Sequence, residues 1–339
     1  MSNIYRLAFW LLLALPMTSC SVLFEEEPAS DQEAIFEHLW NEYRDHYAVF
    51  EERGVNWQAL YDQYRPLVHA QTTDDELFDI ISEMLSHTDD GHVMLIAPGR
   101  ELFNANTIRN NKIGDDLFDE DIISENYLED GYVTDEDVTI LYGKINQANV
   151  GYIWFPHVAD NLPRLHDFLD AYPDANGYII DLRHNSGGDF TWGFSEMGRL
   201  VDQERFAFRS KTKNGKGPND YTDWFEWHVK PKGEYIDKPL VVLIDRYTIS
   251  AGERLTMGFD VLPNVTMVGD TTSGAHSTMI GRELANGWFF TLVTQKVQLA
   301  DGQSYEGIGI APDVRVINEP DEVAQGIDRA LQYAIDLLK

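Results

Sequence analysis

The first part of the chain repeats apolar side chains at the spacing of amphipathic helices. Three such stretches occupy residues 31–50, 57–64 and 72–85. Residues 72–76 read Thr-Thr-Asp-Asp-Glu, which is typical of a helix N-terminus with acids in its first turn. A short apolar run at 93–96 predicts a strand. We therefore expect a helical N-terminal subdomain over residues 31–97.

The pattern changes after a connection at residues 98–140, which is acidic and irregular. Continuous apolar runs then alternate with segments of helical spacing. The runs predict strands buried on both faces, and the alternation indicates an α/β domain with a mainly parallel sheet. The predicted strands are 139–142, 150–155, 177–182, 240–244 and 265–269, and the predicted helices are 162–171, 194–201 and 253–261. We assign residues 141–320 to this core and residues 321–339 to a closing helix.

Two segments of the core carry more specific expectations. Residues 206–238 are polar and aromatic, and are long for a plain connection, so they are predicted to form a lid or an excursion that faces substrate. Residues 288–293 and 296–299 are predicted to pair as two strands.

Charge excludes some classes of partner. The 339 residues contain 57 Asp and Glu but only 26 Lys and Arg, a formal net charge of −31. Without a cationic excess to neutralise phosphate, nucleic acid and anionic lipid are not expected as principal partners.

The N-terminus has the pattern of a secretion signal. Arg6 precedes an apolar run at 7–16 that is too short to span a bilayer as a helix. Small residues then lead to Cys20, the single cysteine, so neither an internal disulfide nor a cysteine-based zinc site is expected. The segment resembles a bacterial lipoprotein signal; the alternative is an ordinary signal with a chance cysteine. We expect a signal peptide over 1–20, lipidation at Cys20, a polar tether over 21–30, and an extracytoplasmic protein anchored to the membrane by lipid.

Ser250 stands at the corner between the predicted strand 239–245 and the predicted helix 253–261. Ala251 and Gly252 are small, so a substrate or another backbone segment can approach closely. A hydroxyl at this corner could act as a nucleophile beside the N–H groups of the helix N-terminus. Taken alone, this stretch favours the alternative that Ser250 is a helix N-cap, which is the commoner role of serine there.

Two further stretches could carry chemistry. Gly187 and Gly188 follow the predicted strand 177–182 and expose consecutive backbone N–H groups, the material of an oxyanion hole or of a plain glycine-rich turn. Glu306 precedes Gly307-Ile308-Gly309-Ile310-Ala311-Pro312-Asp313, where the glycines and the proline indicate a constrained crossing near the sheet.

Four ordered motifs resemble those of one family. They are Asp181-Leu182-Arg183-His184-Asn185-Ser186-Gly187-Gly188, Ser250-Ala251-Gly252-Glu253, Val268-Gly269-Asp270-Thr271-Thr272-Ser273-Gly274 and the glycine-rich motif after Glu306. The chain is similar over residues 145–320 to the serine peptidases of the tail-specific (C-terminal processing) and tricorn group. The resemblance implies a crotonase- or Clp-protease-like α/β spiral core. It also implies a peptide or protein substrate and no metal or other cofactor.

The resemblance also implies site residues. Tail-specific members use a Ser/Lys pair, but Ala275 stands where that lysine would be. Tricorn-like members use serine, histidine and glutamate, and Ser250, His92 and Glu306 match them. His92 would take the serine proton, and Glu306 would fix the imidazole directly or through another hydroxyl. The oxyanion would be received by backbone N–H groups at Gly187, Gly188 and Ala251. His276 is the rival base, and His87 and His184 are weaker rivals.

The segment between Ile96 and Leu141 is too short for the PDZ module that tail-specific members carry, which puts recognition of substrate C-termini in question. Two other functions stay open. A non-catalytic binding protein could retain the peptidase fold, as the family's retinoid-binding repeats do. An esterase is the third alternative, although the sequence before Ser250 lacks the first glycine of a nucleophile elbow.

Overall fold

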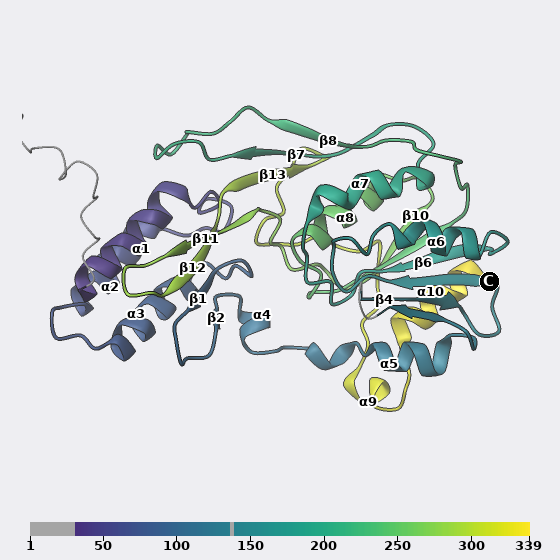
Figure 1. The fold of residues 1–339 in the computed structure, drawn as a ribbon, viewed down its shortest axis with the longest axis horizontal. Coiled ribbons are helices and arrows are strands. Elements are labelled where there is room, and N and C mark those ends of the chain that lie inside the picture. Colours follow the sequence, from purple (N-terminus) through teal and green to yellow (C-terminus); the bar gives the residue numbers. More distant parts are fainter. Residues whose placement is uncertain (1–30, 136–138) are drawn as a thin grey trace, which may run out of the picture.

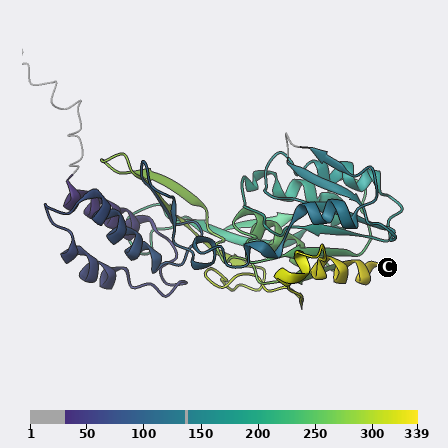
Figure 2. The same cartoon turned by 90° about the horizontal axis from the view of Figure 1, so that it is seen from below.

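The computed structural model describes residues 31–135 and 139–339 (Figure 1). Two bodies lie side by side along the long axis, one mostly helical and one built around a large sheet, and a long three-stranded sheet runs from one to the other. The view from below shows the same division (Figure 2). The predicted signal, Cys20 and the tether lie outside the described residues. Within the described ranges, no helix is long and apolar enough to cross a membrane.

The N-terminal body contains the predicted helices. They are α1 (Gln32–His46), α2 (Trp57–Tyr64), the following 3₁₀ turn (Arg65–Leu67) and α3 (Asp74–Ser86). Thr73 and Glu76 form a capping box at the start of α3, which satisfies two of its unpaired N–H groups. The helices pack on an antiparallel sheet of order β11-β12-β1-β2. Its strands are β1 (Met94–Ile96), β2 (Phe103–Asn104), β11 (Met279–Glu283) and β12 (Phe289–Val293). Residues 279–293, assigned to the core by sequence, therefore pack with this body.

The core contains a seven-stranded sheet of order β14-β10-β9-β6-β5-β4-β3. The five strands from β14 to β5 are parallel, and β4 and β3 are added antiparallel at one edge. The mixed α/β fold with a mainly parallel sheet is thus confirmed. The strands are β3 (Val133–Asp135), β4 (Ile140–Lys144), β5 (Val150–Trp154), β6 (Gly177–Asp181), β9 (Leu240–Ile244), β10 (Val265–Gly269) and β14 (Val314–Arg315).

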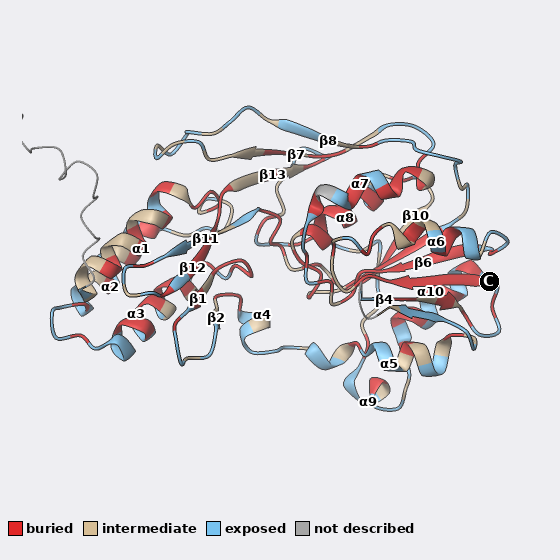
Figure 3. Ribbon diagram, viewed as in Figure 1, coloured by how far each residue is buried: buried red, intermediate tan, exposed pale blue. Residues whose placement is uncertain are grey.

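Helices cover both faces of this sheet, so its central strands are buried (Figure 3). One face packs against α6 (Arg164–Ala171), α7 (Gly193–Glu196) and α8 (Ala251–Asp260), and the other against α10 (Arg329–Leu338). Two predicted helices differ from the structure. The helix expected at 194–201 divides into α7 and a 3₁₀ turn (Met197–Leu200), after another 3₁₀ turn at Phe190–Trp192. The closing helix divides into α9 (Pro320–Val323) and α10, because Gly326 between them has a φ of 77°.

The third sheet has the order β13-β7-β8. It consists of β7 (Arg205–Thr212), β8 (Phe225–Val229) and β13 (Gln295–Leu299), so the aromatic excursion is largely a hairpin. The predicted pairing of 288–293 with 296–299 is wrong. β12 pairs with β1 and β11, whereas β13 pairs with β7. Both segments are strands, but the chain passes from one sheet to another between them.

The segment 98–135 forms several short elements besides β2 and β3. They are α4 (Thr107–Asn110), a 3₁₀ turn (Asp115–Leu117), α5 (Glu120–Ile122) and a π-helical turn (Ile123–Tyr127).

Candidate active site

Ser250 lies at the corner between β9 and α8. Its backbone adopts φ 59° and ψ −119°, a conformation that is costly for a residue with a side chain and that clusters at functional sites. Two contacts hold the corner in place. The Ile249 N–H donates to the Asn185 carbonyl at 3.0 Å, and the Ser250 N–H donates to the Ala275 carbonyl at 3.2 Å. The serine is therefore held at a strained position by segments on either side of it.

The glycine pair of the 181–188 motif packs directly against the serine. A Cβ on Gly187 would lie 2.6 Å from the Ser250 Cβ, and one on Gly188 would lie 2.2 Å from the Val158 carbonyl oxygen. Both positions also have positive φ, so larger residues would be strained there. The Gly187 N–H donates to the Asn185 side chain at 2.9 Å. Gly188 and Ala251 line the pocket that contains Ser250, and their N–H groups make no hydrogen bond to other described residues.

The carboxylate of Glu253 holds the corner at Ser250 in place through hydrogen bonds. Its fully buried carboxylate accepts hydrogen bonds from backbone N–H groups of Ser250, Gly274 and Ala275, from the Thr272 hydroxyl and from His276 Nε2, at 2.6 to 3.2 Å. Burial alone would raise the pKa of this carboxyl. The charge of His276 and the donated hydrogen bonds outweigh burial and lower the pKa to about 2.

His92 lines the same pocket as Ser250. The side chain lies just before β1, and the turn is fixed because the His92 N–H donates to Asp90 Oδ1 at 2.9 Å. Burial lowers the pKa of the imidazole to about 4, although the charges of Asp90 and Glu253 oppose this. Its Nδ1 is buried and has no hydrogen-bond partner among the described residues. The imidazole is therefore neutral at neutral pH and able to accept a proton.

Glu306 belongs to a buried network of charged groups, and it does not line the pocket. Its carboxylate accepts from Arg53 Nη2 at 2.6 Å and from the His276 N–H at 2.9 Å. Arg53 also lies 3.4 Å from Asp90, whose other oxygen accepts from the Tyr47 hydroxyl at 2.7 Å. Glu306 makes no hydrogen bond to the His92 ring within the described ranges. It is connected to the His92 turn through Arg53 and Asp90.

The rival histidines lie away from the pocket lining. His276 is fully buried, and its Nε2 lies 3.0 Å from Glu253. Burial lowers the pKa of His276, but Glu253 outweighs it and the pKa is raised. His184 bonds Asp245 at 2.7 Å and stacks on Tyr247, and His87 bonds the Tyr64 hydroxyl at 2.9 Å.

The pocket has a volume of about 650 Å³ and combines polar and apolar walls. Sequence reasoning did not single out several of its residues, namely Met94, Asn104, Arg109, Asp189, Phe190, Arg254, Thr278, Met279 and Gln295. No local spacing could have indicated them, because they come from seven separate stretches of the chain. Trp227 of the predicted aromatic excursion does reach the pocket.

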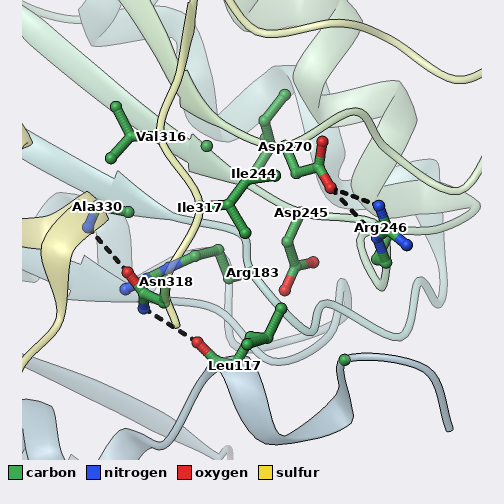
Figure 4. Close-up of a pocket in the computed structure, with 12 residues that line it drawn as sticks. Leu117, Arg183, Ile244, Asp245, Arg246, Asp270, Val316, Ile317, Asn318 and Ala330 are labelled. Atoms are coloured by element: carbon green, nitrogen blue, oxygen red, sulfur yellow. Dashed lines mark hydrogen bonds and ion pairs between the residues drawn. The ribbon is translucent and has the colours of Figure 1, made fainter. Parts of the chain in front are cut away.

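A second hollow lies beyond the ends of β9 and β10 (Figure 4). Asn318 bridges its two sides, because it donates to the Leu117 carbonyl and accepts from the Ala330 N–H. The hollow has a volume of about 30 Å³, which is about the volume that one molecule occupies in liquid water. It is therefore too small to hold a peptide.

Two family profiles match the chain. Residues 149–316 match peptidase family S41, and residues 28–86 match the tricorn protease C1 domain. The first match contains Ser250 and the Gly187-Gly188 pair, and the second covers the three N-terminal helices.

Relatives and solved structures point to the same group. The chain is 28% identical to the carboxy-terminal processing protease CtpA of Bacillus subtilis over 52% of this chain and 37% of that protein. It is 33% identical to a carboxyl-terminal-processing protease of Picosynechococcus over 58% of this chain and 48% of that protein. The chain thus spans less than half the length of these relatives.

A crystal structure of a candidate peptidase from Parabacteroides merdae superposes with a TM-score of 0.81 and 27% identity, covering 91% of this chain and 97% of that one. Residues 149–316 are thus a peptidase family S41 domain, and the chain is similar to the tail-specific (C-terminal processing) and tricorn proteases.

Proposed function

We propose that this protein is a serine peptidase that hydrolyses peptide bonds with Ser250 as nucleophile, His92 as base and Glu306 as the third member of a triad. One observation supports the proposal above all others. Ser250, in a strained strand-to-helix corner, and His92, from the N-terminal body, line a single pocket together with Gly188 and Ala251.

The chemistry follows from the state of each group. The neutral His92 imidazole removes the Ser250 proton as Oγ attacks the carbonyl carbon of the peptide. Negative charge develops on the carbonyl oxygen. The N–H groups of Gly188 and Ala251 are free to donate hydrogen bonds to this oxygen. The imidazolium then gives its proton to the departing amine, and water hydrolyses the acyl-enzyme by the same route in reverse.

Glu306 would act on His92 from a distance in this mechanism. The Arg53 guanidinium links Glu306 to Asp90, and Asp90 holds the turn that carries His92. A hydroxyl group that could lie between Glu306 and His92 is also present. Ser273 Oγ is buried without a partner in the described part of the chain, and lies 3.6 Å from the position that a Cβ on Gly91 would take. We propose that Glu306 orients His92 through this network.

A fluorophosphonate probe tests the nucleophile. We expect the purified protein to be labelled at Ser250 and to cleave peptides in a mixed library, with both activities lost in Ser250→Ala. Labelling that survives Ser250→Ala would exclude Ser250 as the nucleophile. Library cleavage products identified by mass spectrometry would also show the sequence preference.

We also propose that the protein is extracytoplasmic and lipid-anchored through Cys20, because the single cysteine follows a signal-like apolar run. Replacing Cys20 with serine should release the protein from the membrane fraction. Retention of that variant in the membrane would contradict the anchor.

A further inference from the structure

Arg254 is a buried cation in the wall of the catalytic pocket. It lies one helical turn after Ser250, since its N–H donates to the Ser250 carbonyl at 3.1 Å. Its side chain bonds the His276 carbonyl, Thr278 Oγ1 and Gln295 Oε1, at 2.7 to 3.1 Å. Only 7% of the residue is exposed. The guanidinium is therefore held by three partners in the wall of the pocket that contains Ser250.

Every hydrogen-bond partner of Arg254 is neutral. Within residues 31–135 and 139–339 the other arginines with buried side chains, Arg53 and Arg183, each pair with two carboxylates, whereas Arg254 has no ion pair. The charges of Glu253 and Glu306 act on Arg254 from beyond ion-pair distance. Burial therefore lowers the pKa of Arg254 to about 10, although these two charges oppose it. A buried charge without a counter-ion is costly to retain, so a role in binding would explain its presence.

One donor of Arg254 remains available. Nε and Nη2 make the hydrogen bonds described above, whereas Nη1 makes none to the described residues and is not among the buried unpaired atoms. Because Arg254 lines the pocket, Nη1 is the donor that an occupant of the pocket can reach. The ring centroids of Phe190, which lines the pocket, and of the buried Phe208 lie 5.8 and 5.5 Å from the guanidinium carbon.

The pocket differs in charge from the rest of the protein. Its lining contains two arginines, Arg109 and Arg254, and one carboxylate, Asp189. Arg109 also has no ion pair among the described residues; it donates to the Tyr247 carbonyl at 2.6 Å. In a chain of net charge −31, this is a local cationic site. An anionic group would be repelled by most of the surface and attracted here.

We propose that Arg254 is a specificity-determining residue that binds a carboxylate of the peptide substrate beside the scissile bond. The proposal rests on the peptidase function proposed above and names its substrate class. The carboxylate is that of a Glu or Asp side chain, or the terminal carboxylate of a peptide cut near its C-terminus. Either would form a charge-assisted hydrogen bond with Nη1.

The wild-type protein provides the first test. Matched peptides that differ only by Glu or Gln at one position, all with amidated C-termini, measure side-chain recognition. The same Gln peptide with a free or an amidated C-terminus measures terminal recognition. We expect one of these two comparisons to favour the carboxylate by about 10- to 100-fold in kcat/KM, as for a hydrogen bond to a charged group. Equal rates in both comparisons would overturn the proposal.

Variants assign the preference to Arg254. Arg254→Gln should reduce the preference to within about threefold, and Arg254→Lys, which retains a charge, should restore part of it. Arg209→Gln is the matched control, because Arg209 also lacks an ion pair but does not line the pocket. The control should retain the wild-type preference. An Arg254→Gln protein that folds, by circular dichroism, and keeps the full preference would also overturn the proposal.

Failure of the Arg254 proposal can be distinguished from failure of the peptidase proposal. If Ser250 is not labelled by the probe and no peptide in either series is cleaved, the peptidase function fails. If the neutral peptides are cleaved as fast as the acidic ones and labelling is normal, only the role of Arg254 fails.

Discussion

The replacement Glu253→Gln would remove the negative charge of the carboxylate that binds the Ser250 N–H, while nearly preserving the shape of the side chain. One oxygen of Glu253 accepts from the Ser250 and Ala275 N–H groups, and the other accepts from Thr272, Gly274 and His276. A glutamine presents an NH₂ group in place of one of these oxygens. At least two N–H donors would then face another donor, and in either orientation of the amide His276 would lose its counter-ion.

The magnitude follows from the pKa of the carboxyl. Its value of about 2, against an ordinary 4.5, corresponds to about 3 kcal/mol of folding free energy at neutral pH. Breaking a buried ion pair by removing one partner costs about 3–5 kcal/mol, which agrees. Because the pKa is lowered on folding, this contribution is present above pH 4.5 and is lost as the pH falls towards 2. The raised pKa of His276 contributes below pH 6.5 and is lost as the pH rises through its folded value.

Urea unfolding at pH 7 measures the effect, in a Ser250→Ala background that prevents self-cleavage. We expect Glu253→Gln to lower the free energy of unfolding by about 3 kcal/mol. Glu101→Gln is the control: Glu101 is exposed and makes no hydrogen bond in the described structure, so its replacement should change little. A loss below about 1 kcal/mol for Glu253→Gln would refute the view that this carboxylate holds the corner together.

Two further predictions concern the base. His92→Ala should reduce kcat by about 10²- to 10⁴-fold, whereas His276→Gln, which can still donate to Glu253, should reduce it far less; peptide hydrolysis by folded variants decides, and the reverse order would assign the base to His276. Because burial lowers the pKa of His92 to about 4, kcat/KM for an uncharged peptide should fall on the acid side with a midpoint nearer pH 4 than 6.5. A midpoint at or above pH 6.5 would show that the free enzyme does not hold His92 as the structure does.

Local patterns were sufficient for most elements of the core. The buried runs at β6 and β9 lie between turn residues, and a parallel sheet covered on both faces requires such runs. The cap of α3 was readable for a similar reason, since Thr73 and Glu76 satisfy N–H groups a few residues away. These interactions are short in sequence, so the sequence alone indicates them.

Pairing between distant strands was not readable in the same way. The segment at 288–299 shows two strands, but its alternation does not specify which partner each strand takes. The sheet of the N-terminal body draws β11 and β12 from a point about 190 residues further along the chain, since Leu95 pairs with Phe290. That pairing joins the body that carries His92 to the body that carries Ser250.

The candidate active site shows the same difference between what local sequence indicates and what contacts between distant segments decide. The sequence by itself determined a serine at a strand-to-helix corner, a glycine pair after a neighbouring strand, and His92 and Glu306 as candidates to act with it. Only the tertiary structure decided that His92 lines the pocket while His276 is bound to Glu253, and that Arg53 stands between Glu306 and the His92 turn. Only the tertiary structure revealed Arg254 as a buried cation without a counter-ion. The physical reason is that burial and charge pairing depend on neighbours supplied by distant segments, whereas caps, turns and buried strands depend on residues close by.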